Sequence, residues 1–211
     1  AGAAAAAAAA AAPKRDKHGK LVFADAPDFR PVLTPQQVLE RGAFGGCYFR
    51  PITSAVRDGE RLRDQWRELP PAWLANVDAR QHVAASEYNV EVNKYKVPCG
   101  GSLQMWTSKG WLSPLDPYGW FQWYCRFYQG RRCTDDERQI GRWQRCAGDT
   151  GRWRNNLITK IYKSGADYDD ASVSPVVRQT LLHWAYELDE RDYRMGEKKV
   201  KNRLDGGSSK F

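Results

Sequence analysis

Apolar side chains recur every three or four residues in the last third of the chain. They are Val177, Leu181, Trp184 and Leu188. This spacing places them on one face of an α-helix, where they can pack against a core. The stripe follows Ser174-Pro175, and proline is typical of the first helical position. The pattern therefore predicts a core helix that begins at this proline.

Two more amphipathic helices are predicted over residues 135–147 and 152–163, joined by a short turn. Thr134 and Glu137 have the spacing of a capping box at the start of the first helix. Gly148 is expected to stop that helix. The inward apolar positions are Ile140, Trp143 and Ala147 on the first helix and Trp153, Leu157 and Ile161 on the second.

Residues 118–129 are apolar on nearly every side. A helix of this composition is typically buried, because it has no face suited to water. Asp116-Pro117 supplies a cap and a proline at its start, and Gly130 supplies a stop. The segment is therefore predicted to be a buried central helix.

The first half of the chain is less regular. Thr34-Pro35 predicts a helix that ends before Gly42, and residues 57–69 predict a second helix. Residues 42–52 and 76–101 are expected to be irregular loops. With the helices of the second half, the predicted fold class is all-α or strongly α-dominated, with about six helices around a tryptophan-rich core.

The chain of 211 residues suits one folded domain with a tail at each end. Residues 28–193 are predicted to form this single helical domain. Residues 1–27 are predicted to be a low-complexity tail, because a run of alanines and a basic patch offer few side chains that could anchor a core. Residues 194–211 are basic and contain Gly and Ser, so a second tail is expected there.

Positive charge is concentrated in the centre of the chain. The net charge is +8 overall, and residues 117–164 carry +6 of it, from ten basic and four acidic side chains. Residues 165–190 carry −5, from six acidic side chains and one arginine. Clustered basic charge favours an anionic partner, so nucleic acid or an acidic protein surface is expected to bind here.

The two helices beside the turn each present a basic outer side. The candidate binding residues there are Arg138, Arg142, Arg145, Arg152, Asn155, Asn156, Lys160 and Lys163. Two helices joined by a short turn outline a helix-turn-helix over residues 135–163. In that motif the start of the second helix reads base edges, and arginine and asparagine can pair with guanine and adenine. These eight residues are therefore predicted to bind nucleic acid.

Plainer interpretations of the same residues stay open. Surface helices carry Lys and Arg routinely, so the basic sides are also compatible with a solvated surface, or with ion pairs to the acidic segment 165–170. Aromatic and arginine residues alternate over 124–132, which would suit stacking on unpaired bases, but such a run is more often core. Trp143, Trp153 and Trp184 are predicted to be buried in the core.

Signals for catalysis, metal binding or a cofactor are weak, and none is expected. The three histidines belong to no hydrolase or metalloprotease motif, and His183 is expected to be structural. The five cysteines have neither zinc-ligand spacing nor a disulfide pattern, which favours an intracellular, reducing compartment, the nucleus or the cytoplasm. No apolar run approaches the length of a membrane span, so no membrane partner is expected.

Three aromatic-rich or glycine-rich stretches carry a likeness to a known family. They are DPYGWFQWYCRFYQGRRCTDDERQIGRW at 116–143, FGGCYFRPI at 44–52 and NKYKVPCGGSL at 93–103. Together they resemble an uncharacterised family of small Trp/Arg-rich proteins of microbial eukaryotes and large DNA viruses. The resemblance spans residues 34–190 and implies no known activity and no site residues.

The function expected from these observations is non-enzymatic nucleic-acid binding through the basic helical surface. An interaction or scaffold subunit of a larger assembly is the alternative, because a basic surface can also dock on an acidic protein. The third is a small enzyme acting on a nucleotide or nucleic acid, through the glycine-rich loops and clustered acids.

Overall fold

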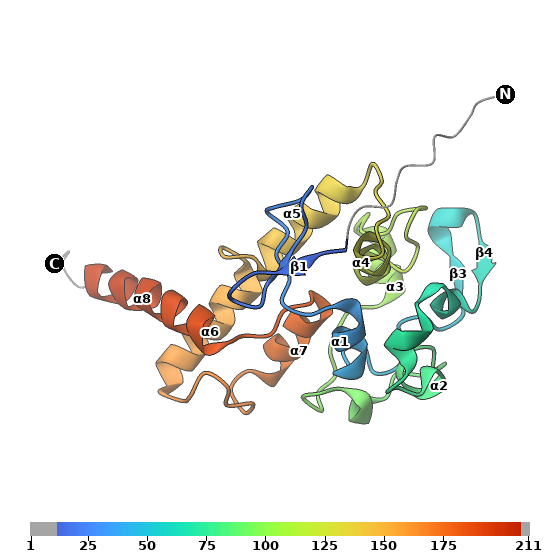
Figure 1. Ribbon diagram of the computed structural model, residues 1–211. Helices are drawn as coiled ribbons and strands as arrows, with labels where there is room; N and C mark the ends of the chain where they lie inside the picture. The colour runs from blue at the N-terminus through green and yellow to red at the C-terminus, as the bar shows by residue number, and fades with distance from the viewer. Residues whose placement is uncertain (1–11, 208–211) are drawn as a thin grey trace.

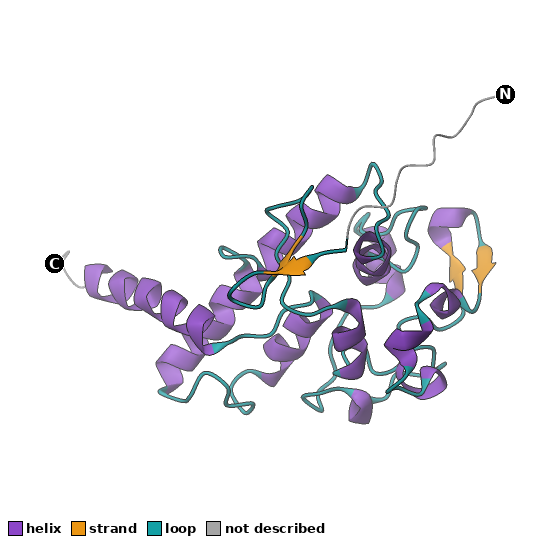
Figure 2. Cartoon of the chain, in the orientation of Figure 1, coloured by secondary structure: helices purple, strands orange, loops and turns teal. Residues whose placement is uncertain are grey.

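The computed structural model describes residues 12–207, so the predicted alanine-rich segment lies almost entirely outside the described residues. Helices dominate the described part, whose strands form two short antiparallel pairs (Figure 1, Figure 2). An aromatic-rich core joins the elements, with Phe29, Trp123 and Tyr124 fully buried in it. The prediction of a helix-dominated fold around tryptophans is confirmed.

The described chain begins with a small antiparallel pair and not with a tail. β1 (Lys14–Arg15) pairs with β2 (Leu21–Val22). Leu21 and Phe23 are buried, and the Phe23 ring stacks on Phe29 with centroids 5.3 Å apart. The predicted tail boundary at residue 27 is therefore wrong, because these two apolar side chains anchor a charged segment to the core.

The first helix, α1 (Pro35–Glu40), begins where it is predicted. The Thr34 side-chain oxygen accepts a hydrogen bond from the Gln37 backbone N–H at 3.2 Å. The Gln37 side chain in turn accepts from the Thr34 N–H at 3.0 Å. This reciprocal pair is a capping box, and it satisfies backbone donors that the helix itself leaves unpaired.

A hairpin stands where the sequence predicts a helix over residues 57–69. β3 (Ile52–Ser54) pairs antiparallel with β4 (Glu60–Leu62). Asp58 and Asp64 have φ angles of 47° and 56°, a left-handed conformation that a right-handed helix cannot contain. The helix prediction is wrong because the spacing of apolar residues gives no sign of the left-handed conformation at these two aspartates.

Short helical segments connect this hairpin to the second half of the chain. The α-helices among them are α2 (Ala79–His82) and α3 (Leu103–Ser108). The 3₁₀ turns of the described chain are Ala55–Arg57, Gln65–Glu68, Pro71–Leu74 and Val90–Val92. Much of 76–101 is irregular, as predicted.

The central helix, α4 (Trp120–Tyr128), is buried on almost every side, as its composition predicts. Phe29 lies against it, with its ring centroid 5.4 Å from Trp123 and 5.6 Å from Tyr124. The Tyr124 hydroxyl donates to the Leu33 carbonyl at 2.6 Å. Large rings with satisfied polar atoms therefore form the centre of the core.

Asp116 does not cap this helix, although the sequence predicts that it does. Gly119 is the residue before the first turn. Asp116 is fully buried, and its carboxylate accepts from Arg126 at 2.9 Å and from Arg131 at 2.6 Å. A buried carboxylate needs such partners, and the two arginines supply them.

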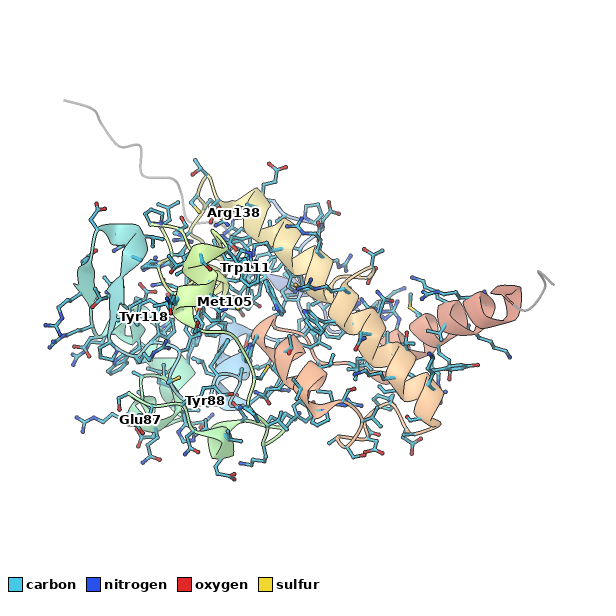
Figure 3. The ribbon with its side chains drawn as sticks, turned by 180° about the vertical axis from the view of Figure 1, so that it is seen from behind. Glu87, Tyr88, Met105, Trp111, Tyr118 and Arg138 are labelled. Atoms are coloured by element: carbon cyan, nitrogen blue, oxygen red, sulfur yellow. The ribbon has the colours of Figure 1, made fainter. Side chains whose placement is uncertain are left out.

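α5 (Asp136–Ala147) and α6 (Arg152–Ser164) have nearly the predicted bounds. Figure 3 shows the two helices following one another along one side of the molecule. The predicted capping box at Thr134 is absent, since Asp135 is the residue before the helix and makes no side-chain cap. Its carboxylate instead accepts from Arg138 at 2.8 Å and is held in an ion pair.

α7 (Pro175–His183) ends at Trp184, which gives residues 116–190 the four helices α4 to α7. Trp143 is buried, and its Nε1 donates to the Trp184 carbonyl at 2.9 Å. Trp153 and Trp184 pack on the core but stay half-buried. The predicted burial is thus correct for Trp143 and incomplete for the other two.

α8 (Glu190–Gly207) occupies a segment that is predicted to be mostly tail from residue 194. Val200 is buried, and a Cβ added at Gly196 would lie 2.6 Å from Ile158 Cδ1, so α8 packs closely on α6. The tail prediction is therefore wrong for residues 194–207, while residues 208–211 lie outside the described residues. Figure 1 shows the far end of α8 extending away from the body. In the described chain no helix is both long and apolar enough to cross a membrane.

Candidate nucleic-acid interface

A cleft of about 760 Å³ lies between α3, the loop after it, and the ends of α5, α6 and α7. Its walls include four indole rings, three of them partly buried and that of Trp111 exposed, and three guanidinium groups. These are Trp106, Trp111, Trp153, Trp184, Arg142, Arg145 and Arg152. We call this space the aromatic cleft. Aromatic rings and cations on the same walls suit a ligand that is both flat and anionic.

One wall of the aromatic cleft is α3 with the loop that follows it. Ser102 caps α3 by accepting from the Met105 N–H at 3.1 Å. Met105 and Trp111 are 38% and 36% exposed, and Figure 3 shows both on this wall, with Arg138 near the start of α5. Arg138 Nη1 donates to the Gly110 carbonyl at 3.3 Å, so α5 holds the loop in place.

Arg142 lies between two indole rings of the aromatic cleft. Its guanidinium carbon is 5.5 Å from the ring centroids of both Trp111 and Trp184. Burial, and then the positive charge of Arg138, lower the pKa of Arg142 to about 10. Arg142 is therefore a cation at neutral pH, yet it forms no salt bridge within residues 12–207. An anion that entered the cleft would compensate this partly desolvated charge.

Arg145 and Arg152 add two exposed cations to the aromatic cleft. The Arg152 guanidinium carbon is 5.2 Å from the Trp153 ring centroid. Burial raises the pKa of the Cys146 thiol, although the nearby charges of these arginines act in the opposite direction. Neither arginine has a carboxylate within salt-bridge distance in the described chain, so this edge of the cleft keeps its positive charge.

The floor of the aromatic cleft is made by the loop 42–49 and the end of α7. Gln179 donates to two carbonyls of this loop, at 3.0 and 2.9 Å. Phe44 stacks on His183, with ring centroids 4.6 Å apart and ring planes inclined by 24°. A second cavity of about 650 Å³ shares this floor and continues past the Gly100-Gly101 loop. The loop 42–49 is thus irregular, as predicted, but it is buried and fixed by side-chain hydrogen bonds.

The predicted basic surface divides into two groups in the structure. The aromatic cleft brings together Arg142, Arg145 and Arg152. The residues that do not line it are Arg138, Asn155, Asn156, Lys160 and Lys163. Arg138 is paired with Asp135. The Asn155 amide donates to the Gly151 carbonyl at 2.9 Å, which engages the group that would read a base in a helix-turn-helix.

The aromatic and arginine residues of 124–132 do not line the cleft. Tyr124 and Phe127 are buried in the core. The arginines among them are engaged by carboxylates, for example Arg132 by Asp25 at 2.6 Å. The interpretation of this run as core is confirmed.

The predicted acidic partner does not neutralise the cleft. Within the described residues no carboxylate of 165–170 forms a salt bridge with a cleft arginine, and Asp170 accepts from Ser172 at 2.7 Å instead. Another cavity, of about 590 Å³, contains Lys20, Arg154 and Asp192, but these charges pair with one another. In this third cavity four carboxylates match the four cations, whereas in the described part of the chain the aromatic cleft is lined by three arginines and no carboxylate.

The cleft residues that are missing from the predicted site include Trp106, Trp111 and His183. Trp106 and Trp111 belong to the short segment 102–112. Two tryptophans on a segment too short to bury them both are a signal of an exposed aromatic surface. His183 has no such signal, because its neighbours come from the distant loop at 42–49.

Comparison with family models, with curated proteins and with solved structures gives no match for this chain. The resemblance to a Trp/Arg-rich family therefore stays a prediction. Function has to be inferred from the geometry and chemistry of the aromatic cleft.

Proposed function

We propose that this protein binds single-stranded nucleic acid in the aromatic cleft, with unpaired bases stacked on indole rings and phosphates bound by arginines. One juxtaposition supports the proposal: Arg142, Arg145 and Arg152 form no salt bridge in the described chain, and they line the same cleft as three partly buried tryptophans and one exposed tryptophan. Stacking on aromatic rings and contacts to phosphate are the two interactions that dominate single-strand binding.

A single strand fits this cleft better than a duplex does. In a duplex the faces of the bases are covered by their neighbours, so they cannot stack on Trp111 or Trp153. The cleft volume of about 760 Å³ is that of a pocket for a few flat groups. The proposal thus keeps nucleic-acid binding but moves its location from the outer sides of α5 and α6 to the cleft beside the first turn of α6.

The charge contribution is tested by measuring fluorescence polarisation of labelled single strands at several salt concentrations. Contacts with about three phosphates predict a log–log salt slope near −2 for a single strand. Arg152→Ala should weaken binding and reduce that slope by about 0.7, because one phosphate contact is lost. Lys163→Ala is the matched control: it removes an exposed cation on the same helix that does not line the cleft.

The stacking contribution is tested with Trp111→Ala, at an exposed position where the change should be tolerated. Loss of one stacked base should cost about 1–3 kcal/mol of binding free energy, without a change in the salt slope. Tighter binding of duplex than of single strands, or equal effects of Arg152→Ala and Lys163→Ala, would contradict the proposal. Competition by an apolar or acidic peptide but not by nucleic acid would favour the interaction-subunit alternative.

A further inference from the structure

His183 is fixed at the floor of the aromatic cleft in one protonation state. Its Nε2 lies 2.6 Å from the Ala43 carbonyl oxygen. A carbonyl oxygen only accepts hydrogen bonds, so Nε2 must carry the ring proton. Burial lowers the pKa of His183 to about 4, and the ring is therefore neutral at physiological pH. The other nitrogen, Nδ1, is left with a lone pair and acts as an acceptor.

Nδ1 has no hydrogen-bond partner among the described residues, and it is not fully buried. A Cβ added at Gly100 would lie 3.3 Å from His183 Cε1 and 3.9 Å from Nδ1. Gly100 has a φ of +98°, so glycine is favoured there, and its lack of a side chain keeps this edge of the ring uncovered. Within the described residues, the bond from Nε2 to the Ala43 carbonyl is the only hydrogen bond of the ring. Both Gly100 and His183 line the cleft.

The ring cannot easily turn away from this position. The Phe44 ring stacks on one face, with centroids 4.6 Å apart, and the Nε2 bond fixes the rotation about the side-chain axis. The Thr180 hydroxyl, one turn earlier on α7, donates to the Val176 carbonyl at 2.8 Å and therefore not to Nδ1 of His183. The acceptor is thus held by a helix and a buried loop, the kind of support that a specific contact requires.

Most of the other polar side chains that line the cleft only donate; the exceptions include the hydroxyls of Thr150 and Thr180, which can also accept. Guanidinium groups and indole N–H groups have no acceptor, so Arg142, Arg145, Arg152 and the tryptophans can bind oxygens of a ligand but not its N–H groups. Adenine, cytosine and guanine each carry an exocyclic amino group that donates. An acceptor at the floor of a stacking cleft is suited to such a group.

From this geometry we propose that Nδ1 of His183 accepts a hydrogen bond from the exocyclic amino group of a stacked base, which makes His183 a specificity-determining residue. The inference rests on the proposed function. It extends that function from sequence-tolerant stacking to preference for amino-bearing bases.

Matched oligonucleotides that differ by one amino group test the inference. Single strands of adenine are compared with single strands of unsubstituted purine, and strands of guanine with strands of inosine. The wild-type protein should bind the amino-bearing member of at least one pair about fivefold more tightly, the effect of one net hydrogen bond. His183→Phe keeps a ring against Phe44 and should abolish this difference while binding to the other member persists. The Ala43 carbonyl still accepts from Gln179 in that variant, at 2.9 Å.

Gly100→Ala serves as the second variant, in case the first does not fold. Its methyl group would lie 3.3 Å from Cε1 and 3.9 Å from Nδ1 of His183 and would crowd this edge of the ring, so the difference within the pair should also shrink. If the wild-type protein binds both members of every pair equally, or if both variants leave the difference unchanged, the inference is overturned and the proposed function stands. If no single strand binds at all, both are overturned.

Discussion

At the scale of single residues, the aromatic cleft depends on polar groups that burial holds in one state. Arg142 stays charged between two indole rings, whereas His183 stays neutral on the floor. The same desolvation disfavours the charged form of each, but a guanidinium starts from a much higher pKa than an imidazole. The cleft therefore combines a cation with a neutral acceptor at neutral pH.

The pKa of His183 makes the stability of the protein depend on pH. It is about 4 in the folded protein, against an ordinary value of 6.5. Between these values the unfolded chain binds more protons, so the free energy of unfolding should rise with pH and fall as pH drops from 6.5 towards 4. The full difference from this one group is roughly 3 kcal/mol.

Urea unfolding followed by tryptophan fluorescence at pH 7 and pH 4.5 measures this dependence. Other groups titrate over the same interval, so the quantity of interest is the difference between wild-type protein and His183→Phe. The variant should be less sensitive to the drop in pH by about 2 kcal/mol or more. The same loss of stability in both proteins would show that His183 is not the buried neutral group described above.

The sequence predicts which arginines of α5 belong to the candidate binding surface better than it predicts what surrounds them. The helical spacing of Arg142 and Arg145 predicts that both lie on an outer side of α5, where the structure leaves Arg145 exposed and Arg142 half-buried. The spacing does not predict the loop that covers Arg142, because Trp111 in that loop lies 31 positions earlier in the chain. The partner of His183, Ala43, is 140 positions away. Contacts of such separation have no local pattern from which they could be predicted.

At the scale of elements, the hairpin of β1 and β2 decides where the folded part begins. Phe23→Ala should destabilise the protein by about 3–5 kcal/mol, the usual cost of deleting a large buried ring, because Phe23 is only 1% exposed. His18→Ala, at an exposed position in the turn of the same hairpin, should change stability by less than about 0.5 kcal/mol. Thermal unfolding of both variants measures the two effects. If residues 1–27 were a tail, both substitutions would have the same, negligible effect on stability.

Elements with strong periodicity or clear end signals are predicted well. α1, α5, α6 and α7 begin within one or two residues of the positions that their sequence patterns indicate. The hairpin at residue 14 and the helix at residue 190 are missed because their apolar residues are few and stand among charges. Tyr193 and Val200, both buried, are seven positions apart in a basic segment. A stripe of that density does not stand out from a solvated tail.

At the scale of the whole molecule, one buried carboxylate joins three distant parts of the chain. Asp192 on α8 is 1% exposed. It accepts from Lys20 beside the N-terminal hairpin at 3.0 Å, from Arg154 on α6 at 3.0 Å, and from the Tyr186 hydroxyl at 3.0 Å. The hairpin and α8, the two segments predicted to belong to tails, are thus fastened to α6 by the same residue.

Asp192→Asn should therefore loosen both ends of the molecule at once. The amide has nearly the same shape, but it leaves the charges of Lys20 and Arg154 without their shared buried counter-ion. Since Arg154 keeps a second partner in Asp149, the expected loss is about 3 kcal/mol, at the lower end for breaking a buried pair. In a chain of this size that loss lowers the unfolding temperature by roughly 10 °C.

Glu190→Gln is the matched control on the same helix, because its 3.6 Å pair with Arg194 is exposed and should contribute less than about 1 kcal/mol. Hydrogen exchange in Asp192→Asn should increase in residues 14–23 and in α8 together; an increase in only one of them would mean that Asp192 does not couple the two segments.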